Sequence, residues 1–186
     1  SKNNIGHVDK DIIGNLVGGG AEAMIRKGYK HLNIKINEKS LPLMIETFIE
    51  YYSKNCTKKT KLYEGVKEIL AFLKKRLTIC LCTNKKNFLA NTILEELNIK
   101  SYFDYILGSD GKILLKPDIS MPLKCIERFG FLGNESIFVG DSRNDIIPAK
   151  KLNMFSVFVN YGYGKLEKNV VPDLCIQKII ELKELV

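Results

Sequence analysis

From Lys61 onward, short apolar runs alternate with amphipathic stretches, and this alternation restricts the possible fold more than any other feature of the chain. The apolar runs have the length of buried strands, whereas the stretches between them have helical periodicity. The expected strands are LTICLCTN (77–84), DYILGSD (104–110), SIFVGD (136–141), FSVFVNYG (155–162) and DLCIQ (173–177). The expected helices are YEGVKEILAFLKKR (63–76), NFLANTILEELNI (87–99), MPLKCIERFG (121–130), DIIPAKKLN (145–153) and a tail helix. This order predicts an α/β fold with a Rossmann-like parallel sheet covered by helices on both faces.

Residues 1–60 have a different pattern, and we expect them to form a small helical domain ahead of a core domain at 61–186. Apolar residues recur there at helical spacing, and LPLMIETFIEYYSKNC predicts a helix with Ser40 as its N-cap and Pro42 in its first turn. The run Gly18–Gly20 interrupts the first helical stretch. It predicts either a helix boundary or a loop that another group approaches closely.

Composition excludes several classes of protein. The net charge is +8, but the lysines are dispersed and no zinc-finger or helix-turn-helix pattern is present, so we expect no nucleic-acid partner. No apolar run is long enough for a membrane span, and no secretory signal is visible. The five cysteines have no CxxC spacing, and Cys80 and Cys82 lie in an apolar run as small hydrophobes. We therefore expect a cytoplasmic monomer or homodimer.

Polar residues follow the first two strands of the expected core. Ligands of parallel α/β sheets bind beyond the carboxyl ends of the strands. Thr83 and Asn84 end the first strand, where a hydroxyl and free backbone N–H groups can hold a phosphate oxygen; the alternative is a helix cap. Lys116 follows the second strand, and Pro117 keeps its backbone extended, so its ammonium can reach the same pocket. The alternative for Lys116 is a solvated loop lysine.

The third strand ends in Gly140-Asp141-Ser142-Arg143-Asn144-Asp145. Two carboxylates after a glycine supply the hard oxygen ligands that Mg2+ takes, usually one or two carboxylates with several waters. Asp141 and Asp145 are therefore candidate metal ligands. The alternative is Asp141 as a helix N-cap with Asp145 on the helix face.

The order Thr, Lys, Asp-x-x-x-Asp on successive strand ends resembles the haloacid dehalogenase-like hydrolase superfamily, and within it the phosphoglycolate phosphatases. LCTNKKNF, LKPD and VGDSRNDI are similar to the second, third and fourth motifs of that family. IGNLVGGGAEAMIRKG is similar to its helical cap, YFDYILGSD to the approach to the lysine, and VNYGYG to a segment after the fourth motif. The resemblance implies an Mg2+-dependent hydrolase that acts on a small phosphorylated metabolite through an aspartyl-phosphate.

The resemblance also implies roles for the candidate residues. Thr83 and the backbone of Asn84 would bind the oxygens of the transferring phosphoryl group, and Lys116 would balance negative charge there. Asp141 would hold Mg2+, and Asp145 would support it through water or from behind the ligands. The helical cap would close over the substrate and exclude water.

The first motif of the family, an apolar strand ending in Asp-x-Asp, has no match here. The only Asp-x-Asp is Asp9-Lys10-Asp11, which follows the poor strand sequence Ile5–Val8 and precedes Ile12-Ile13 rather than small turn residues. We therefore expect that the first core strand and its nucleophile are absent from the sequence as given. The chain would then be incomplete and inactive alone, with exposed strand edges.

Other functions remain compatible with these motifs. Relatives with the same motifs include nucleotide, sugar-phosphate and pyrophosphate hydrolases and phosphomutases, and a chain without a nucleophile could be a non-catalytic phosphate-binding protein on the same fold. The order of Thr83, Lys116 and Asp141 argues against a response-regulator receiver, whose acids come first. Arg26 could bind a substrate carboxylate or be a solvated helix residue. Ile119 and Gly164 depart from the residues usual in the family.

Overall fold

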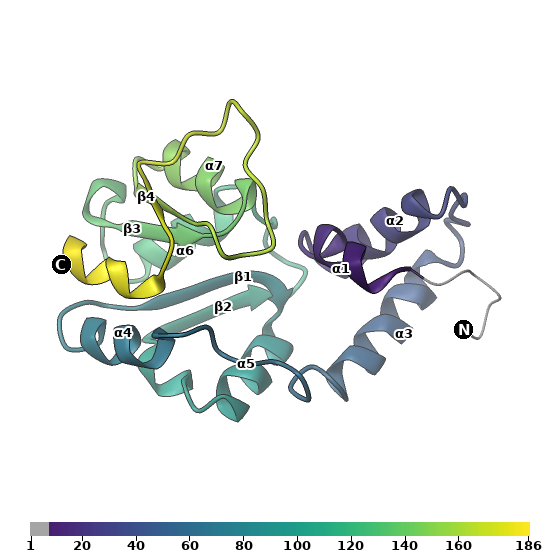
Figure 1. The fold of residues 1–186 in the computed structure, drawn as a ribbon, viewed down its shortest axis with the longest axis horizontal. Helices are drawn as coiled ribbons and strands as arrows, with labels where there is room; N and C mark the ends of the chain where they lie inside the picture. Colours follow the sequence, from purple (N-terminus) through teal and green to yellow (C-terminus); the bar gives the residue numbers. More distant parts are fainter. Residues whose placement is uncertain (1–7) are drawn as a thin grey trace. The chain divides into compact units, whose positions relative to one another are not determined.

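The computed structural model describes residues 8–186, so residues 1–7, with the Ile5–His7 part of the rejected strand, lie outside the described residues. The chain divides into two compact units, one up to Asn55 and one from Cys56 to Val186. Figure 1 shows the helices of the first unit and the strands and helices of the second, with the ribbon coloured from the N-terminus (purple) to the C-terminus (yellow). None of the helices in the described part is long and apolar enough to cross a membrane.

The first unit is helical. Its helices are α1 (Lys10–Leu16), α2 (Ala21–His31) and α3 (Leu41–Ser53). The three glycines Gly18–Gly20 all have positive φ and separate α1 from α2, so this run is a helix boundary. Pro42 lies in the first turn of α3, as predicted. Ser40 occupies the N-cap position of α3, as predicted, but its hydroxyl donates to the carbonyl of Asn37 and makes no capping bond to α3.

The second unit alternates strands and helices. Its α-helices are α4 (Val66–Leu73), α5 (Asn87–Glu96), α6 (Ser120–Glu127) and α7 (Arg143–Lys151). Its strands are β1 (Cys80–Lys86), β2 (Tyr105–Ser109), β3 (Ile137–Gly140), β4 (Phe155–Val159) and β5 (Leu174–Ile176). Three 3-10 turns complete it, η1 (Lys100–Tyr102), η2 (Gly133–Glu135) and η3 (Ile179–Leu185). The tail therefore forms a 3-10 helix.

The strands are parallel, as predicted, but they form two sheets instead of one. β1 pairs with β2, and β3, β4 and β5 form a separate sheet with β4 in its centre. The register of β1 and β2 is irregular between Cys82 and Lys86. The strand thus continues to Lys86, two residues beyond the predicted end, because Lys86 pairs with Ser109.

Helices cover both faces of each sheet, which confirms the predicted layers. On β2, Leu107 packs against Met121 and Cys125 of α6, whereas the next residue, Gly108, faces α5. A Cβ on Gly108 would lie 2.5 Å from the Cα of Asn87, so only glycine allows α5 to approach β2 this closely. Successive strand residues point to opposite faces, so α5 and α6 lie on opposite sides.

The three-stranded sheet is covered in the same manner. Val157 of β4 and Ile176 of β5 pack against Ile69 of α4 and Leu182 of η3 in one buried cluster. On the other face, Phe138 of β3 packs with Ile126 of α6 and with residues of α7, in a cluster completed by Ala149, Met154, Leu123 and Leu152. This second cluster joins α6, which also contacts the two-stranded sheet, to the three-stranded sheet. Side-chain packing through α6 therefore connects the two sheets.

Three helices end in the same way. Asn33, Asn98 and Asn153 have φ near +55° and follow α2, α5 and α7. In each case the N–H of the next residue donates to the carbonyl five positions earlier, for example Ile99 to Leu94 at 3.0 Å. This is the Schellman arrangement, with asparagine in the left-handed position that glycine usually takes. The recurring Leu-Asn pair thus marks the ends of these helices.

We predict that Asn98→Ala lowers the free energy of unfolding by about 1–2 kcal/mol, because alanine tolerates the left-handed conformation poorly. Asn98→Gly should stay within about 0.5 kcal/mol of the native chain, since glycine adopts this conformation freely. Urea unfolding followed by circular dichroism measures both changes. Glu96→Ala, an exposed change in the last turn of the same helix, is the control, and an equal loss for alanine and glycine at position 98 would contradict the interpretation.

Candidate functional site

Lys116 is the residue that connects the strand ends. Its ammonium donates to the carbonyl oxygen of Cys82 in β1 and to Oδ1 of Asp145 in α7, both at 2.7 Å. Its backbone is clamped by the side chain of Asn84, whose Oδ1 accepts from the Lys116 N–H at 2.8 Å and whose amide donates to the Lys116 carbonyl at 2.7 Å. Lys116 is thus fixed in both backbone and side chain.

The ion pair between Lys116 and Asp145 is buried. The two side chains are 10% and 9% exposed, and the ammonium also lies 5.3 Å from the ring centre of Phe138. The second oxygen of Asp145, Oδ2, accepts from the N–H of Ser142 at 3.2 Å and from its hydroxyl at 2.9 Å, as part of a capping box at the start of α7. Both carboxylate oxygens of Asp145 therefore have protein partners.

Asp141 follows β3 directly and lies against the loop after β4. Its Oδ2 accepts from the N–H groups of Tyr163 at 2.9 Å and Gly164 at 3.4 Å. A Cβ on Gly162 would lie 2.2 Å from the Cβ of Asp141, and one on Gly164 would lie 2.1 Å from the Asp141 carbonyl oxygen. The loop can donate to Asp141 only because these positions are glycines. Gly164, a departure from the family pattern, thus has a steric reason in this chain.

Thr83 lies inside β1 and not after it. Its hydroxyl oxygen accepts from the N–H of Lys85 at 3.2 Å, and its neighbours Cys82 and Asn84 are the two β1 residues that bind Lys116. The structure thus brings Thr83, Asn84, Lys116 and Asp145 together at one edge. The capping bonds at α7 are made by Ser142 and Asp145, so Asp141 precedes the N-cap instead of forming it.

Two tyrosines near Asp141 were not predicted. The rings of Tyr63, in the segment before α4, and Tyr161, after β4, have centres 4.9 Å apart. Burial raises the pKa of Tyr161 to about 12, with contributions from Tyr63 and from the charge of Asp141. Burial also raises the pKa of Tyr63, which shares a hydrogen bond with Tyr163. Both phenols are therefore protonated at neutral pH and can donate hydrogen bonds near Asp141.

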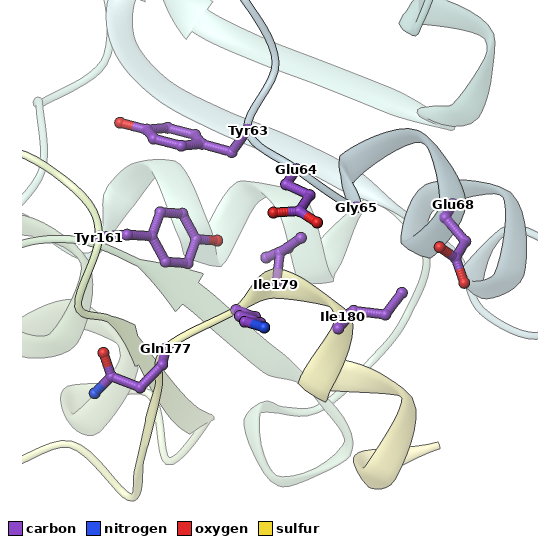
Figure 2. A pocket seen from close by; sticks show the side chains of 9 residues that line it. Tyr63, Glu64, Gly65, Glu68, Tyr161, Gln177, Ile179 and Ile180 are labelled. Carbon is purple, nitrogen blue, oxygen red and sulfur yellow. The ribbon is translucent and has the colours of Figure 1, made fainter.

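A pocket of about 440 Å³ lies beside these tyrosines. Figure 2 shows that the ring of Tyr161 points into the pocket, whereas Gln177 points away from it. Glu64 precedes α4 and Glu68 lies in its first turn, and Ile179 and Ile180 from η3 form an apolar wall. The pocket therefore shares Tyr63 and Tyr161 with the surroundings of Asp141.

Comparison with known proteins identifies the family. The profile of the family described as "Haloacid dehalogenase-like hydrolase" matches residues 2–159. A phosphoglycolate phosphatase of Agrobacterium fabrum is 34% identical over 172 residues, which cover 89% of this chain and 74% of that protein. One of Nitrosococcus oceani is 32% identical over 173 residues, covering 91% and 77%. The chain belongs to the haloacid dehalogenase-like hydrolase family.

The fold of this family member also matches a solved structure. The crystal structure of a predicted phosphoglycolate phosphatase from Haemophilus somnus superposes with a TM-score of 0.88 and 24% identity, over 98% of this chain and 84% of that one. This similarity confirms the α/β fold. The resemblance inferred from the strand-end motifs is therefore correct at the level of the family.

Arg26, in the first unit, forms ion pairs with acidic residues of that unit. Arg26 of α2, a candidate for substrate recognition, donates to Glu22 at 2.8 Å and to both carboxylate oxygens of Glu38 at 2.8 and 2.9 Å. The bond to Glu38 is the main cause that raises the pKa of Arg26 above its usual value. Arg26 is thus bound to two acids of its own unit.

We predict that Lys116→Met lowers the free energy of unfolding by about 3–5 kcal/mol, because it leaves the buried carboxylate of Asp145 without its cation. Asp145→Asn should also destabilise, but the double variant should lose at least about 1 kcal/mol less than the sum. Urea unfolding of the four proteins gives this coupling energy. The exposed pair Lys100 and Glu95, treated identically, should show a coupling below about 0.5 kcal/mol. Additive losses at Lys116 and Asp145 would contradict the buried pair.

Gly164→Ala should cost about 1–3 kcal/mol of stability, since the new methyl group overlaps the backbone of Asp141. The amide resonance of Tyr163 should shift, because the loop must move away from Asp141. Gly28→Ala, in α2 with no atom within 4 Å of the added carbon, is the control and should be neutral or stabilising by up to about 1 kcal/mol. If Gly164→Ala behaves like this control, the loop does not pack on Asp141 as described.

Proposed function

We propose that this protein is an Mg2+-dependent phosphatase that hydrolyses a small phosphate monoester, with phosphoglycolate as the first candidate. The observation that carries the proposal is the fixed ammonium of Lys116, buried between β1 and α7 at the carboxyl ends of the strands. A buried cation held by carbonyl and carboxylate oxygens is positioned before substrate binds. It therefore stabilises negative charge without reorganisation.

In this proposal each strand-end residue has a separate role. Lys116 balances the charge of the phosphoryl group, and Asn84 keeps the lysine backbone in place. The hydroxyl of Thr83 and the backbone N–H of Asn84 bind phosphoryl oxygens. Asp145 orients the ammonium of Lys116 from behind. The geometry of Thr83 next to two residues that contact Lys116 supports this arrangement.

Asp141 is the proposed Mg2+ ligand. Its Oδ2 is oriented by two loop amides, whereas none of the hydrogen bonds assigned among residues 8–186 involves its Oδ1. In this scheme Asp145, with both oxygens bound, supports the site instead of contacting the ion first. One carboxylate together with substrate phosphate and water is a common ligand set for Mg2+, and the ion would shield the charge of the phosphoryl group.

The substrate proposal rests on the relatives, two of which are phosphoglycolate phosphatases at 32–34% identity. We propose that residues 1–60 act as the cap, in which the run Gly18–Gly20, with positive φ at all three positions, separates two helices. Because Arg26 is already bound to two acids, substrate recognition by this arginine would require its release from Glu38. We also propose a cytoplasmic location and a metabolite instead of nucleic acid as partner, which the dispersed positive charge supports.

The test is a substrate panel with full-length protein, with and without Mg2+. The panel contains phosphoglycolate, a nucleotide, a sugar phosphate and pyrophosphate, and phosphate release is the measurement. We expect turnover that requires Mg2+ and is fastest with phosphoglycolate. Absence of Mg2+-dependent turnover with every ester would overturn the proposed function and favour a phosphate-binding protein.

We predict that Asp141→Asn lowers kcat/KM at least about 100-fold, because a proposed metal ligand is lost. The variant should keep its fold, since an amide oxygen can still accept from Tyr163 and Gly164. The control is Asp104→Asn, at the opposite end of β2, which should leave kcat/KM unchanged. Near-native turnover in Asp141→Asn would remove Asp141 from the site.

A further inference from the structure

Three of the five cysteines meet in one side-chain cluster of the second unit. Cys80 and Cys82 come from β1, and Cys125 comes from α6. Because the side chains of a strand alternate between its two faces, Cys80 and Cys82 point to the same face of the sheet. Cys125 is 6% exposed and packs against this face from the helix that covers it. Two thiols of a strand and one thiol of a helix therefore lie together.

The strand register brings Cys82 to Cys125. Cys82 pairs with Leu107 of β2, and Leu107 packs against Cys125. Paired residues of neighbouring strands point to the same face, so Cys82 and Leu107 both face α6. Cys125 also shares hydrogen bonds with the sulfur atoms of Cys80 and Cys82. Cys82 and Cys125 are thus in the contact from which an S–S bond can form.

The thiols of the cluster differ in how readily they ionise. The hydrogen bond with Cys125 is the main cause that lowers the pKa of Cys82, and the charge of Lys116 lowers it further. Cys80 has the same hydrogen-bond partner, but the charge of Asp104 raises its pKa and opposes this effect. The hydrogen bonds with Cys80 and Cys82 raise the pKa of Cys125, which therefore remains the donor. Since the thiolate is the nucleophilic form, Cys82 is the first thiol to react.

The surroundings of the cluster favour oxidation over metal binding. Cys80 and Cys82 are partly exposed, and reactive cysteines are typically found in partly exposed surroundings with positive charge nearby. Within residues 8–186, no group of three or more His, Cys, Asp or Glu side chains is arranged to hold a metal ion. Cys56 and Cys175 lie outside the cluster. A small oxidant therefore meets two neighbouring thiols here.

We propose that Cys82 and Cys125 form an oxidative modification site, where a hydroperoxide such as hydrogen peroxide converts the two thiols to a disulfide. The thiolate of Cys82 attacks hydrogen peroxide, the O–O bond breaks, and the leaving hydroxide takes up the thiol proton as water. Cys82 is then a sulfenic acid. The sulfur of Cys125 attacks the sulfur of Cys82, the S–O bond breaks, and the hydroxyl leaves with the proton of Cys125 as a second water. The two thiols lose two electrons, which the peroxide takes up.

The proposed bond borders the candidate site at the strand ends. The carbonyl oxygen of Cys82 accepts from the ammonium of Lys116 at 2.7 Å, and Thr83 is the next residue of β1. The bond joins α6 covalently to this part of β1. Its formation needs neither a metal ion nor a phosphate ester, so the proposal is independent of the proposed phosphatase activity.

The test is treatment of the reduced protein with hydrogen peroxide, followed by alkylation of the remaining thiols, trypsin digestion and mass spectrometry without reductant. Trypsin cuts after lysine and arginine, so Cys80 and Cys82 share the peptide 77–85, whereas Cys125 lies in the peptide 125–128. We expect these two peptides to be the main linked pair, with fragmentation placing the bond at Cys82. Absence of this pair, or a bond at Cys80 instead, would overturn the proposal.

Cysteine variants assign the bond independently. Cys82→Ser should lower the yield of the linked pair at least about 10-fold, because the attacking thiolate is lost. Cys80→Ser, the matched change on the same face of β1, should keep the yield, as should Cys175→Ser at an exposed cysteine outside the cluster. Loss of the linked pair in Cys80→Ser with retention in Cys82→Ser would contradict the assignment.

Oxidation of the unfolded protein shows whether the fold selects the pair, and it needs no variant. In concentrated urea the same peroxide treatment should give a mixture of pairings among the five cysteines, including Cys80 with Cys82, because 43 positions separate Cys82 from Cys125 along the chain. The folded protein should give mainly the bond between Cys82 and Cys125. The same distribution of bonds in both states would overturn the proposal.

Discussion

The buried ion pair between Lys116 and Asp145 is the interaction on which the arrangement of the strand ends depends. It links β1, the loop after β2 and α7, three segments that share no continuous backbone ladder. Desolvation of two charges is costly, and a buried pair repays it only when the remaining hydrogen-bonding capacity is satisfied. Ser142 and the carbonyl of Cys82 supply these bonds, and Asn84 fixes the lysine backbone. The site is therefore organised around charge positioned in advance, in a pair whose two members have further hydrogen-bond partners.

Much of the fold could be predicted from the sequence because the apolar periodicity is strong. The order of strands and helices in the second unit and the cover of both sheet faces agree with expectation. The strand ends agree less well: β1 continues past Thr83 because Lys86 pairs with Ser109, a contact that local sequence does not encode. Ser40 is a favourable N-cap residue, yet its hydroxyl bonds to Asn37 instead. The division into two sheets likewise depends on tertiary contacts, which the local sequence does not encode.

The sequence predicted that Lys116 and Asp145 lie together at the strand ends, but it did not predict the contacts that hold the candidate residues in place. Lys116 and Asp141 follow strands, Thr83 lies in the middle of β1, and the parallel topology places strand ends together. Asn84 binds the backbone of Lys116, 32 positions further along the chain, and it does so with its side-chain amide instead of its backbone. Tyr63 and Tyr161 come from segments nearly a hundred residues apart and meet only in the folded chain. Spacing within a motif indicates the candidate residues, whereas the groups that orient them come from distant segments.

The division between the two sheets has a consequence for the cooperativity of the second unit. A continuous sheet transmits order from strand to strand through its backbone hydrogen bonds, but within residues 8–186 β1 and β3 are not paired, and side-chain packing connects their sheets. Regions joined by few backbone hydrogen bonds open as separate units, each with its own free energy. The half formed by β1, β2 and α5 can therefore open while β3, β4 and β5 stay folded, and the strength of packing around α6 sets how often it does so.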